Sequence, residues 1–339
     1  MSNIFKITNS EDHLRFLKDQ NFNIYVQHPL FGEFNQNLGD EYFCFSGLKN
    51  NQIVISSLCI LIKAKRGNFL YLPYGPIFKD HSIVKDYFSE LKNLAKQKGC
   101  NFVRISPFLD YTQQNLNLFK SSGFTKSPMH MIAENTCVLD LKDKTKDEVL
   151  KGMNKNHRNL IKKSLKTKEL EVKVSSDSKD IKILHDLLIE TSKRHGFTPF
   201  SLEYLKQEFD TFKKIKAGKI YIAYYNSKPI AASIFYQFCD TKVYKHGASL
   251  SEFRNVPASY LIQWTSILDA INDNIHNYNF WGVAPSKEHK NHPFYGITHF
   301  KMGFGSKQID LIPALDLPIN MFYWFNWIIE TLRRKKRGF

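Results

Sequence analysis

Several kinds of residue are scarce in this chain, and each shortage argues against a class of protein. The 339 residues include only five cysteines, and no Cys-x-x-Cys pair exists for zinc binding or dithiol chemistry. Four of the cysteines lie in apolar runs typical of strands, so we expect a reducing, cytoplasmic location. No window approaches about 18 uninterrupted apolar residues, and the N-terminus lacks a basic stretch followed by an apolar one. Neither a membrane span nor a secretory signal is predicted.

Acidic residues are also in short supply. The chain has 32 Asp and Glu residues against 48 Lys and Arg, which gives a formal net charge of +16. Such a field attracts polyanions, for example RNA, phosphorylated precursors or an anionic membrane face. The length exceeds that of one ordinary core and 42% of the residues are hydrophobic, so two domains are expected.

One order of elements occurs twice. Residues 42–124 predict a hairpin, a strand, an amphipathic helix, a strand and a final turn FKSSGF, and residues 219–304 repeat this order and end in FKMGF. The repeat indicates an α/β (α+β) protein with two tandem domains that arose by internal duplication. We assign residues 1–144 and 145–317 to the two domains and expect a C-terminal helix, 318–339, to pack on the first.

A strongly basic segment lies between the two copies. Residues 151–168 contain seven Lys and Arg residues and no acid. Four cations share one face of the predicted helix, namely Lys155, Arg158, Lys162 and Lys166. The apolar side is expected to comprise Met153, Leu160, Ile161 and Leu165. This helix is either a solvated surface or a footprint for tRNA or another phosphate-rich ligand.

The repeated order is similar to that of acyltransferases of the Gcn5-related N-acetyltransferase (GNAT) fold. Those enzymes hold the pyrophosphate of coenzyme A at the start of a central helix, on a glycine-rich loop. The corresponding turns here, residues 78–87 and 253–260, contain no glycine, and Pro257 removes an N–H donor. A coenzyme A cradle is therefore not expected, and no cofactor is predicted.

Seven strings, in order, resemble the Fem family of peptidoglycan-bridge aminoacyltransferases. They are NHRNLIKKSLK, ETSKRHGFTPFSLEYL, KPIAASIFYQF, YKHGAS, FRNVPASYLIQW, YNFWGV and HFKMGFGSKQIDL. The resemblance covers about residues 25–320 and is densest over 190–310. It implies two GNAT-like domains and transfer of an amino acid from aminoacyl-tRNA to an amine of a peptidoglycan precursor stem peptide. Larger members carry a long helical arm, for which 168–219 leaves no room, so this chain is similar to the compact form.

Lys301 is the main catalytic candidate. It stands between Phe300 and Met302, before a Gly-Phe-Gly turn that leads into an apolar strand. Aminolysis of an ester passes through an oxyanion, and a fixed cation beside that oxygen lowers the barrier; loss of one such donor costs about 3–4 kcal/mol elsewhere. The resemblance assigns the catalytic lysine to Lys301 and the adjoining aromatic to Phe300. The other interpretation is a solvated lysine at a strand end.

Acceptor binding is assigned to a second set of residues. The attacking amine must lose a proton, and His246 and Tyr204 correspond to positions where compact members place tyrosines at the acceptor pocket. Tyr244 is expected on the same strand face as His246, because strand side chains alternate. Each of these positions also has a purely structural interpretation. His289, His292 and His299 lack neighbouring Cys or carboxylate residues, so no metal site is predicted.

Three further positions depart from the pattern of the compact members. The resemblance implies a Lys, an Asp and an Arg that contact a nucleotide-linked precursor, whereas this chain has Asn35, Ser106 and Phe200 there. Two cations that would hold a diphosphate are thus missing. The acceptor is then held by other basic residues, or it is a lipid-linked precursor or a molecule outside the cell wall.

The last segment combines aromatic and basic residues. Residues 321–337, MFYWFNWIIETLRRKKR, have the composition of a segment that contacts anionic lipid, although the resemblance implies a helix packed on the first domain. The leading prediction is a monomeric aminoacyltransferase in the cytoplasm, with a peripheral contact at the inner membrane face. One alternative is an N-acyltransferase that uses acyl-CoA or acyl carrier protein on a cell-surface polysaccharide or amine. The other is a non-catalytic protein that binds RNA or membranes.

Overall fold

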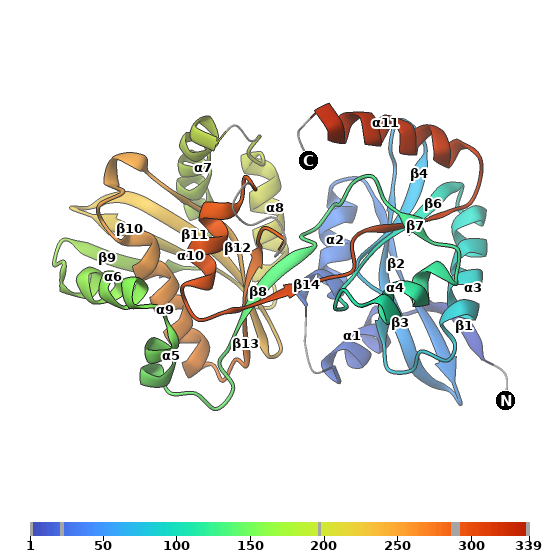
Figure 1. Cartoon of the computed structure of the whole chain (residues 1–339), viewed down its shortest axis with the longest axis horizontal. Helices are drawn as coiled ribbons and strands as arrows, with labels where there is room; N and C mark the ends of the chain where they lie inside the picture. The colour runs from blue at the N-terminus through green and yellow to red at the C-terminus, as the bar shows by residue number, and fades with distance from the viewer. Residues whose placement is uncertain (1–2, 21–23, 196–197, 286–291, 337–339) are drawn as a thin grey trace. The chain divides into compact units, whose positions relative to one another are not determined.

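The computed structural model describes residues 3–20, 24–195, 198–285 and 292–336. Contacts divide the chain into two compact units, with residues 1–134 and 310–339 in unit 1 and residues 135–309 in unit 2 (Figure 1). Each unit contains one mixed β-sheet with helices packed on it, which is the predicted α/β architecture.

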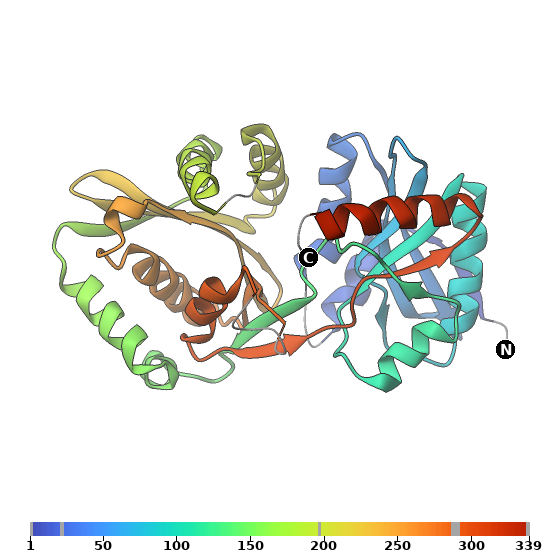
Figure 2. The same cartoon turned by 45° about the horizontal axis from the view of Figure 1, so that its top comes forward.

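Unit 1 is built around a sheet of order β1-β2-β3-β4-β6-β15-β7, with β5 beside β3. Its strands are β1 (Ile4–Thr8), β2 (Glu41–Lys49), β3 (Gln52–Ile62), β4 (Asn68–Tyr74), β5 (Ile77–Phe78), β6 (Cys100–Pro107), β7 (Thr125–Lys126) and β15 (Leu315–Pro318). Its helices are α1 (Ser10–Lys18), α2 (Pro29–Asn37), α3 (Val84–Gln97), α4 (Gln113–Lys120) and α11 (Phe322–Lys336). The core lies between α3 and the sheet, where Tyr87, Phe88 and Leu91 are buried. In Figures 1 and 2, α11 runs across the strands of this sheet.

Unit 2 has a sheet of order β14-β8-β13-β12-β11-β10-β9. Its strands are β8 (Asn135–Asp140), β9 (Leu170–Ser175), β10 (Gly218–Tyr225), β11 (Lys228–Phe238), β12 (Thr241–Ser249), β13 (Asn277–Gly282) and β14 (Lys307–Asp310). Its helices are α5 (Lys146–Gly152), α6 (Lys155–Lys166), α7 (Ile181–His195), α8 (Leu202–Lys213), α9 (Ala258–Asn272) and α10 (Tyr295–Met302). The central helix α9 buries Leu261, Ile262 and Ile267 against the sheet.

The two sheets follow the same order, and in each of them one strand comes from outside the repeat. In unit 2, β8 pairs antiparallel with β13, and in unit 1, β15 pairs antiparallel with β6. The predicted boundary after residue 144 places β8 in the first domain, and the boundary after residue 317 places β15 in the second. Strand pairing is a long-range contact, so local sequence signals give no sign of this exchange.

The local elements of the repeat are confirmed. Both hairpins turn through two residues with positive φ, Asn50 and Asn51 (53° and 62°) in unit 1, and Asn226 and Ser227 (48° and 63°) in unit 2. Such tight turns match the twist of the flanking strands and favour asparagine. The two amphipathic helices form as α3 and α9, with their apolar faces buried.

The units differ where the central parallel strands meet. In unit 1, β4 and β6 pair at seven positions, up to Tyr74 and Pro107. In unit 2, β12 and β13 pair at three positions only, up to Val243 and Asn279, although both strands continue further. The sheet of unit 2 therefore opens between these strands. Among the described residues, no helix is long and apolar enough to cross a membrane.

Candidate active site around Lys301

Helix α10 positions Lys301. The sequence predicted a turn at this lysine, but Lys301 lies in the last turn of the helix, and the bend begins at Gly303. The hydroxyl of Thr298 accepts a 2.8 Å hydrogen bond from the backbone N–H of Ala284, which ties α10 to the segment after β13. Gly305 has φ of +85°, a conformation that glycine adopts without strain. The chain can therefore turn sharply into β14 directly after Lys301.

The side chain of Lys301 is buried, with 4% of its surface exposed. Its Nζ donates a 2.7 Å hydrogen bond to the carbonyl oxygen of Gly282 and lies 5.5 Å from the ring centroid of Tyr244. Burial lowers the pKa of Lys301 to about 8, because the desolvated ammonium is disfavoured. No second hydrogen-bond acceptor for this ammonium is found in the part of the chain that the structure describes.

The ammonium of Lys301 lies where the parallel strands β12 and β13 separate. Gly282 ends β13 and Tyr244 belongs to β12, so the ammonium contacts both strands beyond their last paired residues. Strand β13 carries a bulge between Asn279 and Gly282, and the Asn279 side chain accepts the backbone N–H of Trp281 at 2.8 Å. This bulge directs the Gly282 carbonyl toward the lysine. The arrangement is therefore built from backbone irregularities on two strands.

Tyr244 and His246 lie on opposite faces of the sheet, so the prediction that they share a face is wrong. Strand β12 has a bulge at Lys245, and the pairs on either side of it are Phe235 with Tyr244 and Ile234 with His246. Paired residues share a face, and Ile234 and Phe235 are consecutive, so the two faces differ. Tyr244 stacks on Phe235 at 5.3 Å, on the α9 side, where burial raises its pKa.

His246 belongs to a cluster on the α8 side. Its Nε2 lies 3.0 Å from a carboxylate oxygen of Glu208, which is fully buried. Phe200 packs edge-on against the His246 ring at 5.5 Å and stacks on Tyr204 at 4.5 Å. Burial, followed by the charge of Glu208, raises the pKa of Tyr204. Three of the predicted acceptor residues, Tyr204, His246 and Phe200, thus meet in one cluster, and Tyr244 joins Lys301 instead.

Sequence reasoning missed Lys245 and Glu208. The ammonium of Lys245 lies 4.5 Å from the ring centroid of Trp281, so this second cation reaches the same bulged end of β13 as Lys301. Burial lowers the pKa of Lys245, and the carboxylate of Glu208 opposes that shift. Simple alternation of side chains along β12 does not predict a contact between Lys245 and β13. Lys245 is the extra residue of the bulge, and the bulge cannot be read from the sequence. Glu208 lies in the amphipathic helix α8, and the sequence alone does not distinguish a buried acid in such a helix from an exposed one.

Phe300 belongs to an aromatic cluster that joins α10 to the basic helix α6. Its ring packs edge-on against Tyr260 and Phe304, both at 5.2 Å. The fully buried His157 of α6 lies with Nε2 2.8 Å from the carbonyl oxygen of Phe300. A Cβ atom on Gly303 would lie 2.0 Å from the His157 ring, so this close approach requires glycine. The contacts fix the turn that carries Lys301.

The cations of α6 are not equivalent. Lys155, Lys162 and Lys166 are exposed. Arg158 is half-buried, and its guanidinium donates to the backbone carbonyls of Lys151 and Met153 at the end of α5. The buried side of the helix consists of His157, Ile161 and Ser164. Leu165, which was predicted on the apolar side, is 60% exposed, because the buried face of α6 is centred on His157, Ile161 and Ser164.

The two remaining predicted residues lie in unit 1. Asn35 is half-buried on α2, and its side-chain amide donates to the carbonyl oxygen of Phe31 at 2.6 Å. Ser106 lies in β6 and is buried, with 3% of its surface exposed. Both residues thus belong to unit 1, whereas Lys301 belongs to unit 2.

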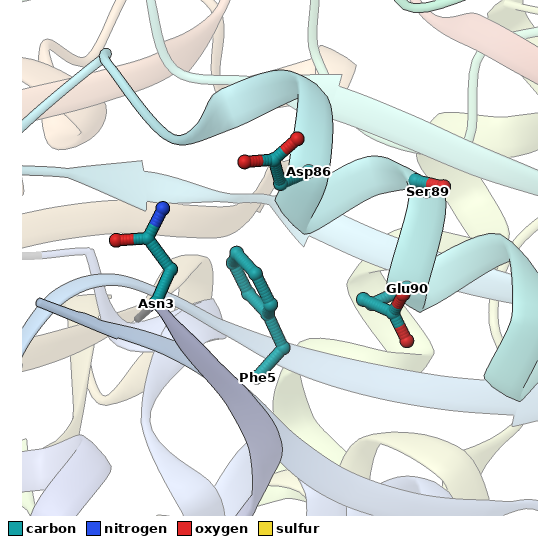
Figure 3. Close-up of a pocket in the computed structure, with 5 residues that line it drawn as sticks. All are labelled: Asn3, Phe5, Asp86, Ser89 and Glu90. Atoms are coloured by element: carbon teal, nitrogen blue, oxygen red, sulfur yellow. The ribbon is translucent and has the colours of Figure 1, made fainter. Parts of the chain in front are cut away.

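Two pockets accompany these elements. One, of about 260 Å³, lies beside α10 and the start of α6 and includes Asn154, His299 and Met302 in its lining. The other, of about 400 Å³, lies in unit 1 between β1 and α3, where Phe5 faces Asp86 and Glu90 (Figure 3). Its acidic lining does not suit a phosphate-rich ligand. Over the described ranges, which omit His289, no three His, Cys, Asp or Glu residues are grouped to hold a metal ion.

Comparisons with known proteins agree on the fold and family. The profile of the FemAB family matches residues 8–228 and 213–331. Aminoacyltransferase FemA of Staphylococcus aureus (strain MRSA252) is 25% identical over 363 aligned residues, which cover 81% of this chain and 86% of FemA. The crystal structure of FemX superposes with a TM-score of 0.82 at 16% identity, over 97% of this chain and 100% of FemX. A tandem GNAT protein from the clavulanic acid biosynthesis pathway gives 0.61 at 8% identity, over 94% and 99%. The predicted fold of two tandem GNAT-like domains is confirmed.

Proposed function

This chain belongs to the FemAB family, as its sequence motifs predicted, and we infer from that membership that it is an aminoacyltransferase. The proposed reaction moves an amino acid from aminoacyl-tRNA to an amine on the stem peptide of a peptidoglycan precursor. The amine nitrogen attacks the ester carbon, an amide bond forms, and the ester bond to the ribose hydroxyl of the tRNA breaks. The nitrogen loses a proton and the ribose oxygen gains one.

The observation that carries this proposal is the buried ammonium of Lys301. It is fixed by one hydrogen bond to Gly282, it faces the ring of Tyr244, and it lies where β12 and β13 separate. A cation held in a site with little water stabilises a developing oxyanion far more than a cation in bulk solvent does. With a pKa of about 8, most of the side chain is still charged at neutral pH. Phe300 contributes by packing the turn on which Lys301 stands.

His246 is the proposed proton acceptor, and it would act from the α8 side of the sheet, on β12 beyond the last residue paired with β13. The carboxylate of Glu208 accepts from Nε2, so Nε2 carries the ring proton and Nδ1 is the basic nitrogen of the neutral imidazole. Phe200 and Tyr204 supply an aromatic surface beside it on which a peptide stem can pack. Tyr244 would contact the aminoacyl ester beside Lys301.

The proposed partners follow from charge. The exposed lysines of α6 (Lys155, Lys162 and Lys166) can neutralise tRNA phosphates, and Arg158 is partly committed to α5. The acceptor is a lipid-linked or a nucleotide-linked precursor. We expect a monomer that works in the cytoplasm, where charged tRNA is found, with residues 321–337 in peripheral contact with the membrane.

The acyl-CoA alternative has weaker support. Helix α9 begins after Pro257, which supplies neither an N–H nor a side-chain cap at the position where a pyrophosphate would sit. Binding of labelled coenzyme A at micromolar concentration would favour that alternative over transfer from tRNA.

The test is a transfer assay with the full chain. The protein is incubated with total charged tRNA and a panel of lipid-linked and nucleotide-linked stem peptides, and the acceptors are analysed by mass spectrometry. We expect one acceptor to gain the mass of one amino acid residue, and ribonuclease treatment of the tRNA should abolish the gain. No gain with any acceptor would refute the proposal.

A further inference from the structure

Helix α11 presents large apolar side chains to solvent. Phe325, Ile328 and Leu332 recur at spacings of three and four and continue the spacing from Met321, which directly precedes the helix, so they line one side of it. The exposed fractions of Met321, Phe325, Ile328 and Leu332 are 79%, 62%, 53% and 61%, and Phe322 beside them is 71% exposed. An outward apolar stripe of this kind marks an interaction surface, whereas single exposed apolar residues are ordinary.

The opposite side of α11 is fixed to unit 1 by polar contacts. The side-chain amide of Asn326 donates to the carbonyl oxygen of Arg66 at 3.1 Å, and the indole N–H of Trp327 donates to that of Lys126 at 3.4 Å. Glu330 accepts a 2.7 Å hydrogen bond from the buried guanidinium of Arg104. Rotation of the helix to bury its apolar stripe would break all three contacts and leave Arg104 without one of its carboxylate partners. The outward direction of the stripe is therefore built into the unit.

Positive charge borders this stripe. The last turn of α11 contributes Arg333, Arg334, Lys335 and Lys336. The backbone carbonyls that accept the Asn326 and Trp327 hydrogen bonds belong to Arg66 and, at the end of β7, to Lys126, so Lys65, Arg66 and Lys126 add basic residues close to the helix. The one acid near the end of the helix, Glu330, is already paired with Arg104. The complementary partner combines an anionic layer with an apolar interior, as a bilayer with anionic headgroups does.

We propose that α11 is an interfacial helix that docks unit 1 onto an anionic lipid surface. Its apolar stripe inserts between lipid headgroups, and the cations of its last turn, with Lys65, Arg66 and Lys126 close by, contact lipid phosphates. The apolar stripe runs along a helix of 15 residues, about 22 Å long, so the helix would lie in the plane of the surface. The role of docking rests on the proposed function, because it would hold the enzyme where a lipid-linked acceptor is embedded. RNA phosphates could pair with the basic residues, but RNA offers no apolar interior in which the stripe could be buried.

Vesicle binding of the full chain tests this proposal. Sedimentation is measured with vesicles of phosphatidylcholine alone and of an equal mixture with phosphatidylglycerol. The apolar variant carries Phe325→Ser, Ile328→Ser and Leu332→Ser, and its control carries Ile4→Ser, Ile7→Ser and Leu165→Ser, all at exposed positions. The charge variant carries Arg333→Gln, Lys335→Gln and Lys336→Gln, and its control carries Lys179→Gln, Lys213→Gln and Lys216→Gln. Thermal unfolding checks that every variant folds.

The wild type and both controls should bind the anionic vesicles and not the neutral ones. The apolar variant should lose at least about tenfold in affinity, and the charge variant a similar amount. Binding by the apolar variant equal to that of the wild type would overturn the proposal. So would a dimer in light scattering that only the apolar variant dissociates, because the stripe would then be covered by a second copy. Loss of tRNA affinity by the charge variant, with vesicle binding unchanged, would equally overturn it.

Transfer assays separate this proposal from the proposed function. The apolar variant should keep its transfer rate to a soluble nucleotide-linked acceptor, and should lose transfer to an acceptor embedded in anionic vesicles. Transfer without vesicle binding would contradict docking alone. Vesicle binding that depends on α11, without transfer to any acceptor, would contradict the proposed reaction alone.

Discussion

Burial of the charged Lys301 side chain lowers the free energy of unfolding, and the substitution Lys301→Met allows this effect to be measured. Methionine keeps most of the volume and removes the ammonium. Desolvation moves the pKa of Lys301 from 10.5 to about 8, which corresponds to a loss of roughly 3 kcal/mol in the free energy of unfolding at neutral pH. The methionine variant escapes this loss, but it leaves the Gly282 carbonyl without its donor, which costs about 1–3 kcal/mol.

The desolvation of the ammonium and the loss of the hydrogen bond to Gly282 can be told apart, because only the first of them depends on pH. Between pH 8 and 10.5 the unfolded chain keeps the lysine proton while the folded chain releases it, so the wild type gains stability as pH rises. The methionine variant lacks this gain, and the unpaired carbonyl costs the same at every pH. The stability of Lys301→Met relative to the wild type should therefore fall by about 2–3 kcal/mol from pH 7 to pH 10.

Urea-induced unfolding at pH 7 and pH 10, followed by tryptophan fluorescence, measures this difference. Lys179→Met serves as the control, because Lys179 is exposed and its removal should leave the pH dependence unchanged. The same stability difference at both pH values would refute the reasoning, since Lys301 would then titrate alike in the folded and unfolded chains.

Three further predictions concern the surroundings of Lys301. His157→Leu should lower the free energy of unfolding by about 1–3 kcal/mol, because the carbonyl of Phe300 loses a buried partner; thermal unfolding measures it, and an unchanged melting temperature would contradict it. Glu208→Gln should lower kcat about tenfold or more with little change in KM for aminoacyl-tRNA, because His246 loses the carboxylate that orients it, and steady-state rates equal to those of the wild type would count against that role. Replacement of the exposed lysines of α6 by glutamine should weaken tRNA binding and reduce the slope of log affinity against log salt by about 2–3, as filter binding can measure, and an unchanged slope would remove α6 from the tRNA site.

The sequence predicted what local signals determine. The Asn50–Asn51 and Asn226–Ser227 turns need residues that tolerate positive φ, and the apolar spacing of α3 and α9 specifies one buried face. Both kinds of signal lie within about 15 residues of chain, so they are readable without the fold. The order of these elements was enough to indicate the family and the two-unit architecture.

The backbone irregularities were not predictable. A single extra residue at Lys245 places Tyr244 and His246 on opposite faces, and alternation gives no sign of it. The exchange of β8 and β15 between the sheets depends on pairing across most of the chain. No local pattern encodes either feature.

The turn in the first copy shows the same limit. An alignment of the strings FKSSGF and FKMGFG by sequence pairs Lys120 with Lys301. An alignment by the glycines with positive φ, Gly123 and Gly305, is shifted from it by one residue. Counted back from those glycines, Lys301 corresponds to Phe119, which is fully buried in the core of unit 1. The first copy therefore holds a core phenylalanine where the second holds the ammonium, and Lys120 is not the counterpart of Lys301.

The proposed function depends above all on the ammonium of Lys301. Single-turnover transfer from aminoacyl-tRNA to the acceptor is therefore measured with wild type, Lys301→Met and Lys179→Met at pH 7. Lys301→Met should lose at least about a hundredfold in rate while tRNA binding persists, and Lys179→Met should match the wild type. A Lys301→Met protein that transfers at the wild-type rate would show that the ammonium does not promote the transfer.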